Sequence, residues 1–187
     1  AFWIFSIADI SMAQEVIRLP DDVPGPPYLL DQAGETYILT QDISAPGTAI
    51  TIATPGITLD LNGKTISYNE LGLDNTRGIT ASVVTGNLTR LINGKIIQDK
   101  QGKKSHAVYL NLGNIEVSHL NITISEGDNY DTDAILVDWG SRANIHDNVI
   151  YHYGRAVTDR SQGAGVIEIL RTKGGNNIYN NKIIGGP

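Results

Sequence analysis

The stretch ITLDLNGKTI, residues 57–66, sets a pattern that the chain repeats. A short run of aliphatic and β-branched residues reaches an asparagine, turns, and leaves through a second apolar run. Four weaker copies follow, namely LTRLINGKII (88–97), IEVSHLNITI (115–124), RANIHDNVIY (142–151) and NNIYNNKIIG (176–185). Recurrence of about 30 residues with drifting spacing indicates stacked units that need their neighbours to bury their apolar sides.

An asparagine stands at the turn of each copy. The five are spaced 31, 28, 27 and 33 residues apart and are Asn62, Asn93, Asn121, Asn148 and Asn181. Asparagine tolerates the left-handed backbone of a tight bend, and its amide can bond to the asparagine of the adjacent repeat. We therefore expect an asparagine ladder, with a direct sugar contact as the alternative role.

Each repeat divides into three short strands. The first strands are predicted at 49–53, 78–81, 107–111, 134–138 and 166–170, the second strands before the asparagines and the third strands after them. The central residues of the first strands are expected to form one interior column, made of Ile50, Ile79, Val108, Ile135 and Ile167. Alternation then places Tyr109, Leu136 and Glu168 outside. The prediction is an all-β chain of about five coils with three strands each, stacked in parallel.

Composition narrows the function classes. The 187 residues are 41% hydrophobic, which suffices for a core, and carry a net charge of −6. No basic stripe is present to neutralise phosphates, so a nucleic-acid partner is not expected. The chain has no cysteine, which excludes a disulfide scaffold and a thiolate zinc site.

The N-terminal residues 1–13, AFWIFSIADISMA, hold an apolar run too short to span a bilayer. The small residues Ser11 and Ala13 follow this run, at the two positions that a signal peptidase inspects. We read the segment as the remainder of a secretory signal. This predicts a secreted or cell-surface protein with no membrane span in the mature chain.

Residues 14–48 are predicted to be an approach and cap segment. Four prolines between residues 20 and 27 predict no regular structure over 14–34. The stack itself is predicted over 49–187. Because GGP follows the last copy with no polar terminal repeat, we expect further coils beyond residue 187.

The extra residues of the repeats fall at one corner, between a third strand and the next first strand. They are segments 67–77, 98–106, 125–133 and 151–164, which must project side by side and hold most of the charge. Long loops on a rigid frame commonly carry binding and chemistry.

The phrases GETYILTQDIS, ITLDLNGKTI and ANIHDNVI resemble the right-handed parallel β-helix proteins of the pectate-lyase-like superfamily over residues 35–187. The resemblance implies a right-handed β-helix and an extracellular polysaccharide as partner. It also implies a groove that runs along the first strands and is walled by the corner loops. Lyases, hydrolases, epimerases, tail-spike proteins and adhesins share this fold, so the resemblance is specific for fold and not for activity.

The leading expectation is a polysaccharide lyase that acts by β-elimination on uronic-acid sugars. This reaction needs a base beside the uronate carboxylate and a cation to stabilise the developing charge. The catalytic candidates at the corner are Lys104, His106, Arg155 and Arg160. The substrate-binding candidates are Tyr109, Lys103, His152 and Glu168. Trp139 is assigned to local packing.

Three aspartates within six residues, Asp128, Asp131 and Asp133, are candidate ligands of Ca²⁺, which could bridge an acidic sugar to the protein. The phrase NYDTDAI differs from the paired-aspartate motif of polygalacturonases, because Ala134 replaces a glycine and the other motifs are missing. The WIDH phrase of pectate lyases is also missing, and His119 and His146 are placed near the asparagine bend, away from the groove.

A noncatalytic surface or adhesive β-helix protein is the main alternative, and a sugar epimerase or glycoside hydrolase are weaker alternatives. A solenoid whose loops only bind would show saturable glycan binding without turnover.

Overall fold

The computed structural model describes residues 15–82, 86–111, 113–127, 131–154 and 165–185. The predicted secretory segment 1–13 lies outside these ranges. Throughout the described part of the chain the regular elements are β-strands, and every strand pair is parallel. No helix within these ranges is long and apolar enough to cross a membrane.

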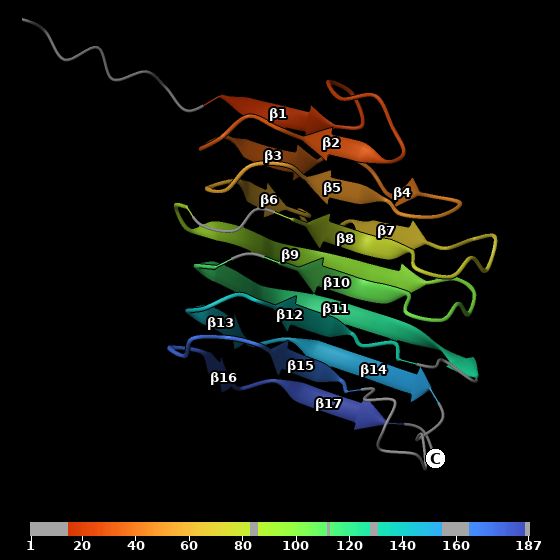
Figure 1. Ribbon diagram of the computed structural model, residues 1–187. Coiled ribbons are helices and arrows are strands. Elements are labelled where there is room, and N and C mark those ends of the chain that lie inside the picture. The colour runs from red at the N-terminus through yellow and green to blue at the C-terminus, as the bar shows by residue number, and fades with distance from the viewer. Residues whose placement is uncertain (1–14, 83–85, 112, 128–130, 155–164, 186–187) are drawn as a thin grey trace, which may run out of the picture.

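The strands form two sheets (Figure 1). The larger has eleven strands: β1 (Val16–Leu19), β3 (Thr36–Leu39), β4 (Ile43–Ser44), β6 (Thr58–Asp60), β7 (Thr65–Tyr68), β9 (Thr89–Gln98), β11 (Ile115–Gly127), β13 (Ala143–His146), β14 (Val149–Gly154), β16 (Asn177–Tyr179) and β17 (Lys182–Gly185). The smaller has six strands: β2 (Tyr28–Leu30), β5 (Ile50–Ile52), β8 (Arg77–Ala81), β10 (His106–Leu110), β12 (Ile135–Asp138) and β15 (Ile167–Leu170).

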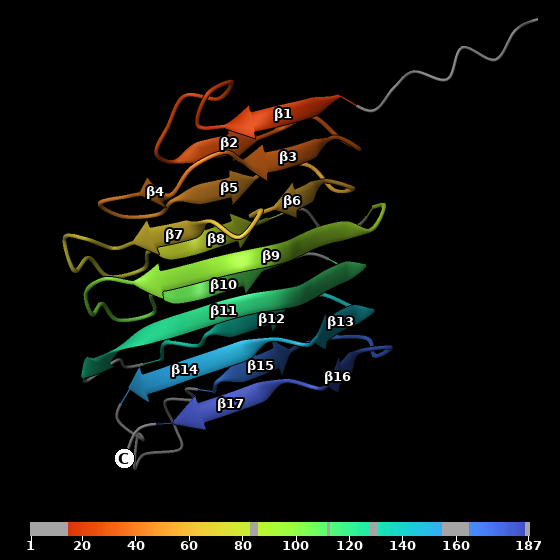
Figure 2. The ribbon, with the colours of Figure 1, turned by 180° about the vertical axis from the view of Figure 1, so that it is seen from behind.

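The chain passes alternately between the two sheets, which lie one behind the other (Figures 1 and 2). Each visit to a sheet adds a strand beside the strand of the previous visit. The second and third strands of a repeat are separate at β6 and β7 but continuous in β9 and β11. An all-β chain with parallel sheets is therefore confirmed, and the arrangement is compatible with a parallel β-helix.

The predicted interior column of the six-stranded sheet is confirmed residue by residue. Ile50 pairs with Ile79, Ile79 with Val108, Val108 with Ile135, and Ile135 with Ile167. The first four of these side chains are fully buried. Because strand side chains alternate, the neighbouring residues form a second column on the other side of the sheet: Leu29, Thr51, Thr80, Tyr109, Leu136 and Glu168. Leu136, predicted to lie outside, is buried at 7% exposure, so the prediction for this residue is wrong.

The eleven-stranded sheet contributes interior columns of its own. One consists of isoleucine in six consecutive paired strands: Ile43, Ile66, Ile96, Ile122, Ile150 and Ile183. The first five are buried, and Ile183 is exposed. Stacked β-branched side chains keep few rotamers and suit a pleated surface, so they pack densely against one another. The apolar columns of the two sheets together form one core.

The expectation of no regular structure over residues 14–34 is wrong. β1 pairs with β3, and β2 pairs with β5, so a strand precedes the first predicted repeat and places Tyr28 beside Ile50. Leu30 is buried and Leu29 is exposed, as alternation requires. The four prolines fall between β1 and β2, where a missing N–H removes no hydrogen bond of the sheet.

The asparagine ladder exists for two of the five predicted members. The Nδ2 of Asn148 donates to Asn181 Oδ1 (2.9 Å) and to the Val117 carbonyl (3.0 Å), and Asn148 Oδ1 accepts from the Leu120 N–H (3.0 Å). Asn121 is in register with Val149, the residue after Asn148, and therefore does not face Asn148. The side-chain Oδ1 of Asn121 has no hydrogen-bond partner.

The bend itself holds a different set of residues. Five consecutive repeats place a residue with positive φ there: Asn62, Asn93, His119, Asp147 and Asn180. The position of the asparagine relative to the bend therefore shifts by a residue or two from repeat to repeat. The left-handed backbone is the constant feature of the bend, and asparagine is one way of adopting it.

We expect Asn148→Ala to lower the free energy of unfolding by roughly 1–3 kcal/mol, because it leaves the buried Leu120 N–H and Val117 carbonyl without their partner. Asn121→Ala is the matched control. It should change the free energy of unfolding by less than about 0.5 kcal/mol, since the side-chain Oδ1 of Asn121 has no hydrogen-bond partner to lose. Urea unfolding of both variants measures the difference, and equal losses would contradict the two-member ladder.

Candidate functional site

The predicted corner exists over the described loops. The segments that follow β7, β9 and β11 lie side by side, on the edge seen at the right of Figure 1. The Lys103 N–H donates to Asp74 Oδ1 (2.8 Å), and the Lys103 carbonyl accepts from the Asn75 N–H (2.8 Å). The Thr132 hydroxyl donates to the Gly102 carbonyl (3.2 Å). The fourth segment, 151–164, lies mostly outside the described residues.

A buried polar network fixes these loops to the core. The Ser105 carbonyl accepts from the Tyr68 hydroxyl (2.7 Å) and from Gln98 Nε2 (3.2 Å). The Ser105 hydroxyl donates to the Leu73 carbonyl (3.0 Å) and contacts the Thr76 hydroxyl (3.1 Å). Burial raises the pKa of Tyr68 well above its ordinary value, so this phenol stays a hydrogen-bond donor. The loops are therefore preorganised at the start of β8 and β10.

Three consecutive repeats place a titratable residue at or just before the start of their strands in the six-stranded sheet. Arg77 in β8 is in register with His106 in β10, and Asp133 precedes β12. The Asp133 N–H donates to His106 Nδ1 (3.0 Å), which continues the row to a third coil. The register thus brings together a cation, an imidazole and a carboxylate whose sequence spacings are 29 and 27 residues.

His106 and Asp133 are both buried, with side-chain exposures of 4% and 0%. Asp133 Oδ1 accepts from the Gly165 N–H (2.6 Å), which links this row to the coil that contains β15. Asp133 Oδ2 lies 3.1 Å from His106 Nδ1, but that nitrogen already accepts the Asp133 N–H, so Oδ2 has no hydrogen-bond partner. The predicted catalytic residue His106 therefore does not reach solvent.

Tyr109 lies on the outward face of β10, as predicted. The Arg77 guanidinium carbon is 4.9 Å from the centroid of the Tyr109 ring, a cation–π contact, and the His106 ring stacks on Tyr109 with centroids 5.8 Å apart. Burial lowers the pKa of Arg77, while the neighbouring Tyr109, Tyr68 and the aspartates oppose this shift. Arg77 was not identified from the sequence.

Two of the predicted residues form an ion pair at the rim of this site. Lys104 Nζ lies 3.5 Å from Asp131 Oδ2, and both side chains are partly exposed. The predicted calcium ligands Asp131 and Asp133 therefore differ in environment, since the Asp131 carboxylate pairs with Lys104 at the rim and the Asp133 carboxylate is buried and accepts from the Gly165 N–H. No group of three His, Asp or Glu side chains that could hold a metal occurs in the ranges that the structure describes, and Asp128 lies outside them.

Glu168 and His152 lie beside the same region. Glu168 follows Tyr109 and Leu136 in the second column of the six-stranded sheet. Burial is the main cause that raises the pKa of Glu168, and the charges of Asp133, Asp131 and Asp138 raise it further. His152 Nε2 lies 3.1 Å from the Thr132 carbonyl, below the loop that carries Asp131. The predicted residues Arg155 and Arg160 lie outside the described residues.

A second cluster, at the other end of the same strands, was missed. Asp138 is buried at the end of β12 and forms a bidentate ion pair with Arg171. Arg171 Nε donates to Asp138 Oδ1 (2.8 Å), and Arg171 Nη2 donates to Asp138 Oδ2. The Arg171 guanidinium lies 4.8 Å from the Trp139 ring centroid. The hydrogen bond to Asp138 raises the pKa of Arg171. The spacing of 33 residues, close to one repeat, was the signal that could have linked Asp138 and Arg171.

His119 and His146 lie in β11 and β13 of the eleven-stranded sheet and not on this face, as expected. His146 Nδ1 lies 2.8 Å from Asp147 Oδ2, and this hydrogen bond lowers the pKa of Asp147. The His146 ring stacks on Tyr179 with centroids 4.8 Å apart. These contacts support a structural role.

The outer face of the six-stranded sheet therefore offers cations, carboxylates and aromatic rings from at least three coils. Such a mixture can donate to and accept from several hydroxyl groups at once. The scan against family models finds no match to this chain, and the searches of curated proteins and of solved structures also find no match.

The raised pKa of Glu168 makes the fold less stable as pH rises. The folded protein binds its proton more tightly than the unfolded chain, so the favourable contribution is complete below the ordinary glutamate pKa and is lost as pH rises through the folded value. Glu168→Gln should therefore raise the free energy of unfolding at neutral pH, by less than about 1 kcal/mol because the carboxylate is partly exposed and its charge is screened. At acid pH the variant and the parent should be equal.

Urea unfolding at the two pH values measures this effect. Glu116→Gln is the control, because Glu116 pairs with Arg90 (3.2 Å) on the other sheet, and its loss should lower the stability at neutral pH. A Glu168→Gln variant that loses stability at neutral pH would contradict the assigned repulsion.

Proposed function

We propose that this protein binds an extracellular polysaccharide on the outer face of its six-stranded sheet, with uronic-acid glycans as the ligand class. The observation that carries the proposal is the contact between Arg77 and Tyr109, flanked by the Lys104–Asp131 pair and by Glu168. Arg77 supplies a fork of N–H donors that suits a sugar carboxylate or a pair of hydroxyl groups.

The rigidity of this face supports the proposal. Arg77 Nη1 donates to the Thr76 carbonyl (2.7 Å) and to the Lys104 carbonyl, and the Arg77 N–H donates to the Thr48 hydroxyl (3.1 Å). A polymer that lies across several coils meets groups that the register already holds in place, so little side-chain entropy is lost when it binds.

The proposal includes a finer description of the fold, a right-handed parallel β-helix of the pectate-lyase-like kind. Crossovers between parallel strands of one sheet are right-handed in about 98% of cases, and the strands of both sheets here are parallel, which supports the right-handed form of the proposal. It also includes secretion, since segment 1–13 has the apolar run and small residues of a secretory signal and the ligand is extracellular.

β-Elimination is the second candidate function, and the closeness of two cationic residues favours it, since Arg77 Nη1 donates to the Lys104 carbonyl. A base removes the proton beside the uronate carboxylate, and the Arg77 guanidinium, held by the Thr76 and Lys104 carbonyls, is placed to stabilise the charge. The electron pair of the broken C–H bond then forms a carbon–carbon double bond as the glycosidic C–O bond breaks, and the leaving glycosidic oxygen takes a proton from water. Lys104 is close enough to the site, through its pair with Asp131, to stabilise the charge that develops. If the protein does not cleave the glycan that it binds, its proposed function is that of a noncatalytic adhesive protein.

Ca²⁺ is also proposed as a ligand of this site, where it would compete with Lys104. A cation that binds Asp131 must displace Lys104 from it, so calcium and Lys104 compete for the same carboxylate. Lys104→Ala should therefore strengthen any calcium binding.

The binding proposal is tested by calorimetric titration with pectate, alginate and glycosaminoglycans, each with calcium and with a chelator. We expect saturable binding of at least one of them. Arg77→Gln should weaken it at least tenfold, or about 1.4 kcal/mol, because the cation is lost. Absorbance of unsaturated sugar in the same mixtures reports β-elimination.

Arg90→Gln is the matched control, since Arg90 is an exposed arginine of the eleven-stranded sheet. It should bind as the parent does. Binding of none of the three glycans, or equal weakening by Arg77→Gln and Arg90→Gln, would contradict the proposed face. Binding without the absorbance of unsaturated sugar would contradict the lyase function and support a protein that only binds the glycan.

A further inference from the structure

We propose that the indole of Trp139 is a stacking platform for a sugar ring, and that the binding face extends across β12 and β15 to this residue. The inference rests on the proposed glycan binding and adds a subsite that the Arg77 region does not require.

Trp139 is unusual in its exposure, since it is 58% exposed. Its φ of 59° lies in the left-handed region, which is unfavourable for a bulky side chain. Arg171, which follows the in-register residue Leu170, has a φ of 49°, so this backbone belongs to the turn and does not by itself require a tryptophan. An exposed indole is also unfavourable in water, so neither burial nor local conformation accounts for a tryptophan here.

The ring is nevertheless held in one place. Arg171 lies over one face of the indole at 4.8 Å, and the buried carboxylate of Asp138 fixes both Nε and Nη2 of Arg171. The backbone N–H of Trp139 donates to the Leu170 carbonyl (3.1 Å), which connects this turn to the next repeat. One face of the ring is thus covered by a fixed guanidinium, and an aromatic ring preorganised in this way loses little entropy when a ligand stacks on its other face.

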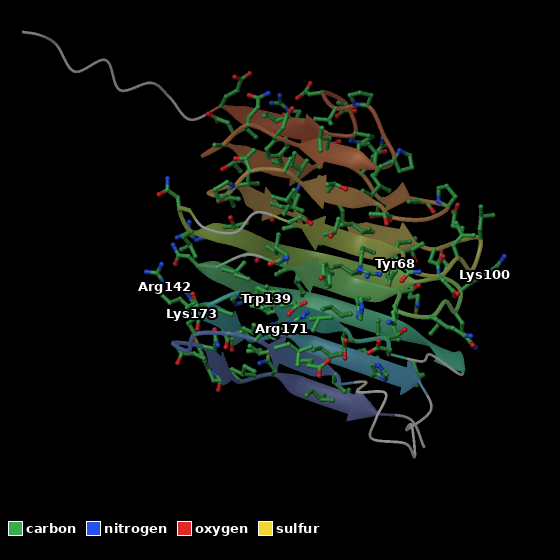
Figure 3. All side chains as sticks on the ribbon, viewed as in Figure 1. Tyr68, Lys100, Trp139, Arg142, Arg171 and Lys173 are labelled. Atoms are coloured by element: carbon green, nitrogen blue, oxygen red, sulfur yellow. The ribbon has the colours of Figure 1, made fainter. Side chains whose placement is uncertain are left out.

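The platform belongs to the same surface as the Arg77 region. Figure 3 shows Trp139 and Arg171 together on the near face, with Lys100 at the opposite corner. Glu168 lies between the two clusters, because it is in register with Leu136, and Asp133 precedes the strand of Leu136 while Asp138 ends it. Trp139 is three residues beyond Leu136, the partner of Tyr109, which places it about 10 Å further along the strand direction.

A sugar ring is the occupant that this chemistry fits. Its apolar C–H face can cover an indole while its hydroxyl groups bond to nearby charged side chains, and Glu168 and Arg171 are such groups. Tyr109, predicted to stack on sugar, is less suited, since Arg77 and His106 both pack on its ring. We therefore assign the stacking of a sugar ring to Trp139 and not to Tyr109.

The test uses the small number of tryptophans, since the chain has two, Trp3 and Trp139. In a Trp3→Phe variant all indole fluorescence comes from Trp139. We expect titration with fragments of pectate, alginate or glycosaminoglycan to change this fluorescence, with the same dissociation constant that calorimetry gives for the same fragment. Trp139→Tyr should bind within about threefold of the parent, whereas Trp139→Asn should bind at least tenfold more weakly.

Trp139→Asn is chosen because asparagine favours the left-handed backbone, so the fold should persist, and urea unfolding checks this. Lys173→Ala, an exposed change in the turn after β15, is the control and should bind like the parent. If a fragment binds by calorimetry while Trp139 fluorescence is unchanged and Trp139→Asn binds equally well, the stacking subsite is wrong and the binding face around Arg77 stands. If no fragment binds at all, both are wrong.

Discussion

Burial of the apolar side of one repeat by the next is the constraint on which this structure depends. A unit of about 30 residues has too few aliphatic side chains to offset the entropy of ordering its backbone. Parallel pairing in register solves this, because it places isoleucine on isoleucine in six successive strands of one column and nearly the same in the column that begins at Ile50. A slip of one residue would turn each column outward, so the register is strongly specified.

The same register organises the outside of the molecule. Residues one repeat apart become neighbours, and this brings Arg77, His106 and Asp133 together although they span 57 residues of sequence. The proposed site is therefore a row across coils and not a loop motif. Its charges are mostly matched in pairs, which agrees with a modest net charge of −6 and favours recognition of a ligand rich in hydroxyl groups over one held by charge alone.

Sequence reasoning succeeded where one residue per repeat decides the outcome. The interior column, the outward position of Tyr109 and Glu168, and the shared corner of the loops all follow from alternation and spacing. It failed where local geometry varies between repeats. The bend shifts by one or two residues, so Asn121 left the ladder, and prolines that were read as a break proved to separate two strands. Pairs such as Asp138 with Arg171 depend on rotamers and turn conformation, which periodicity does not encode.

Distances between spin labels on the second column of the six-stranded sheet test the stacking most directly, since the chain has no cysteine of its own to interfere. Cysteines placed at Thr51 and Glu168, four strand spacings apart, should give a distance of about 19 Å, and those at Leu29 and Glu168, five spacings apart, about 24 Å. A constant increment per strand is the result that parallel stacking in register predicts. Distances that do not increase with the number of intervening strands, or that exceed these values severalfold, would contradict it.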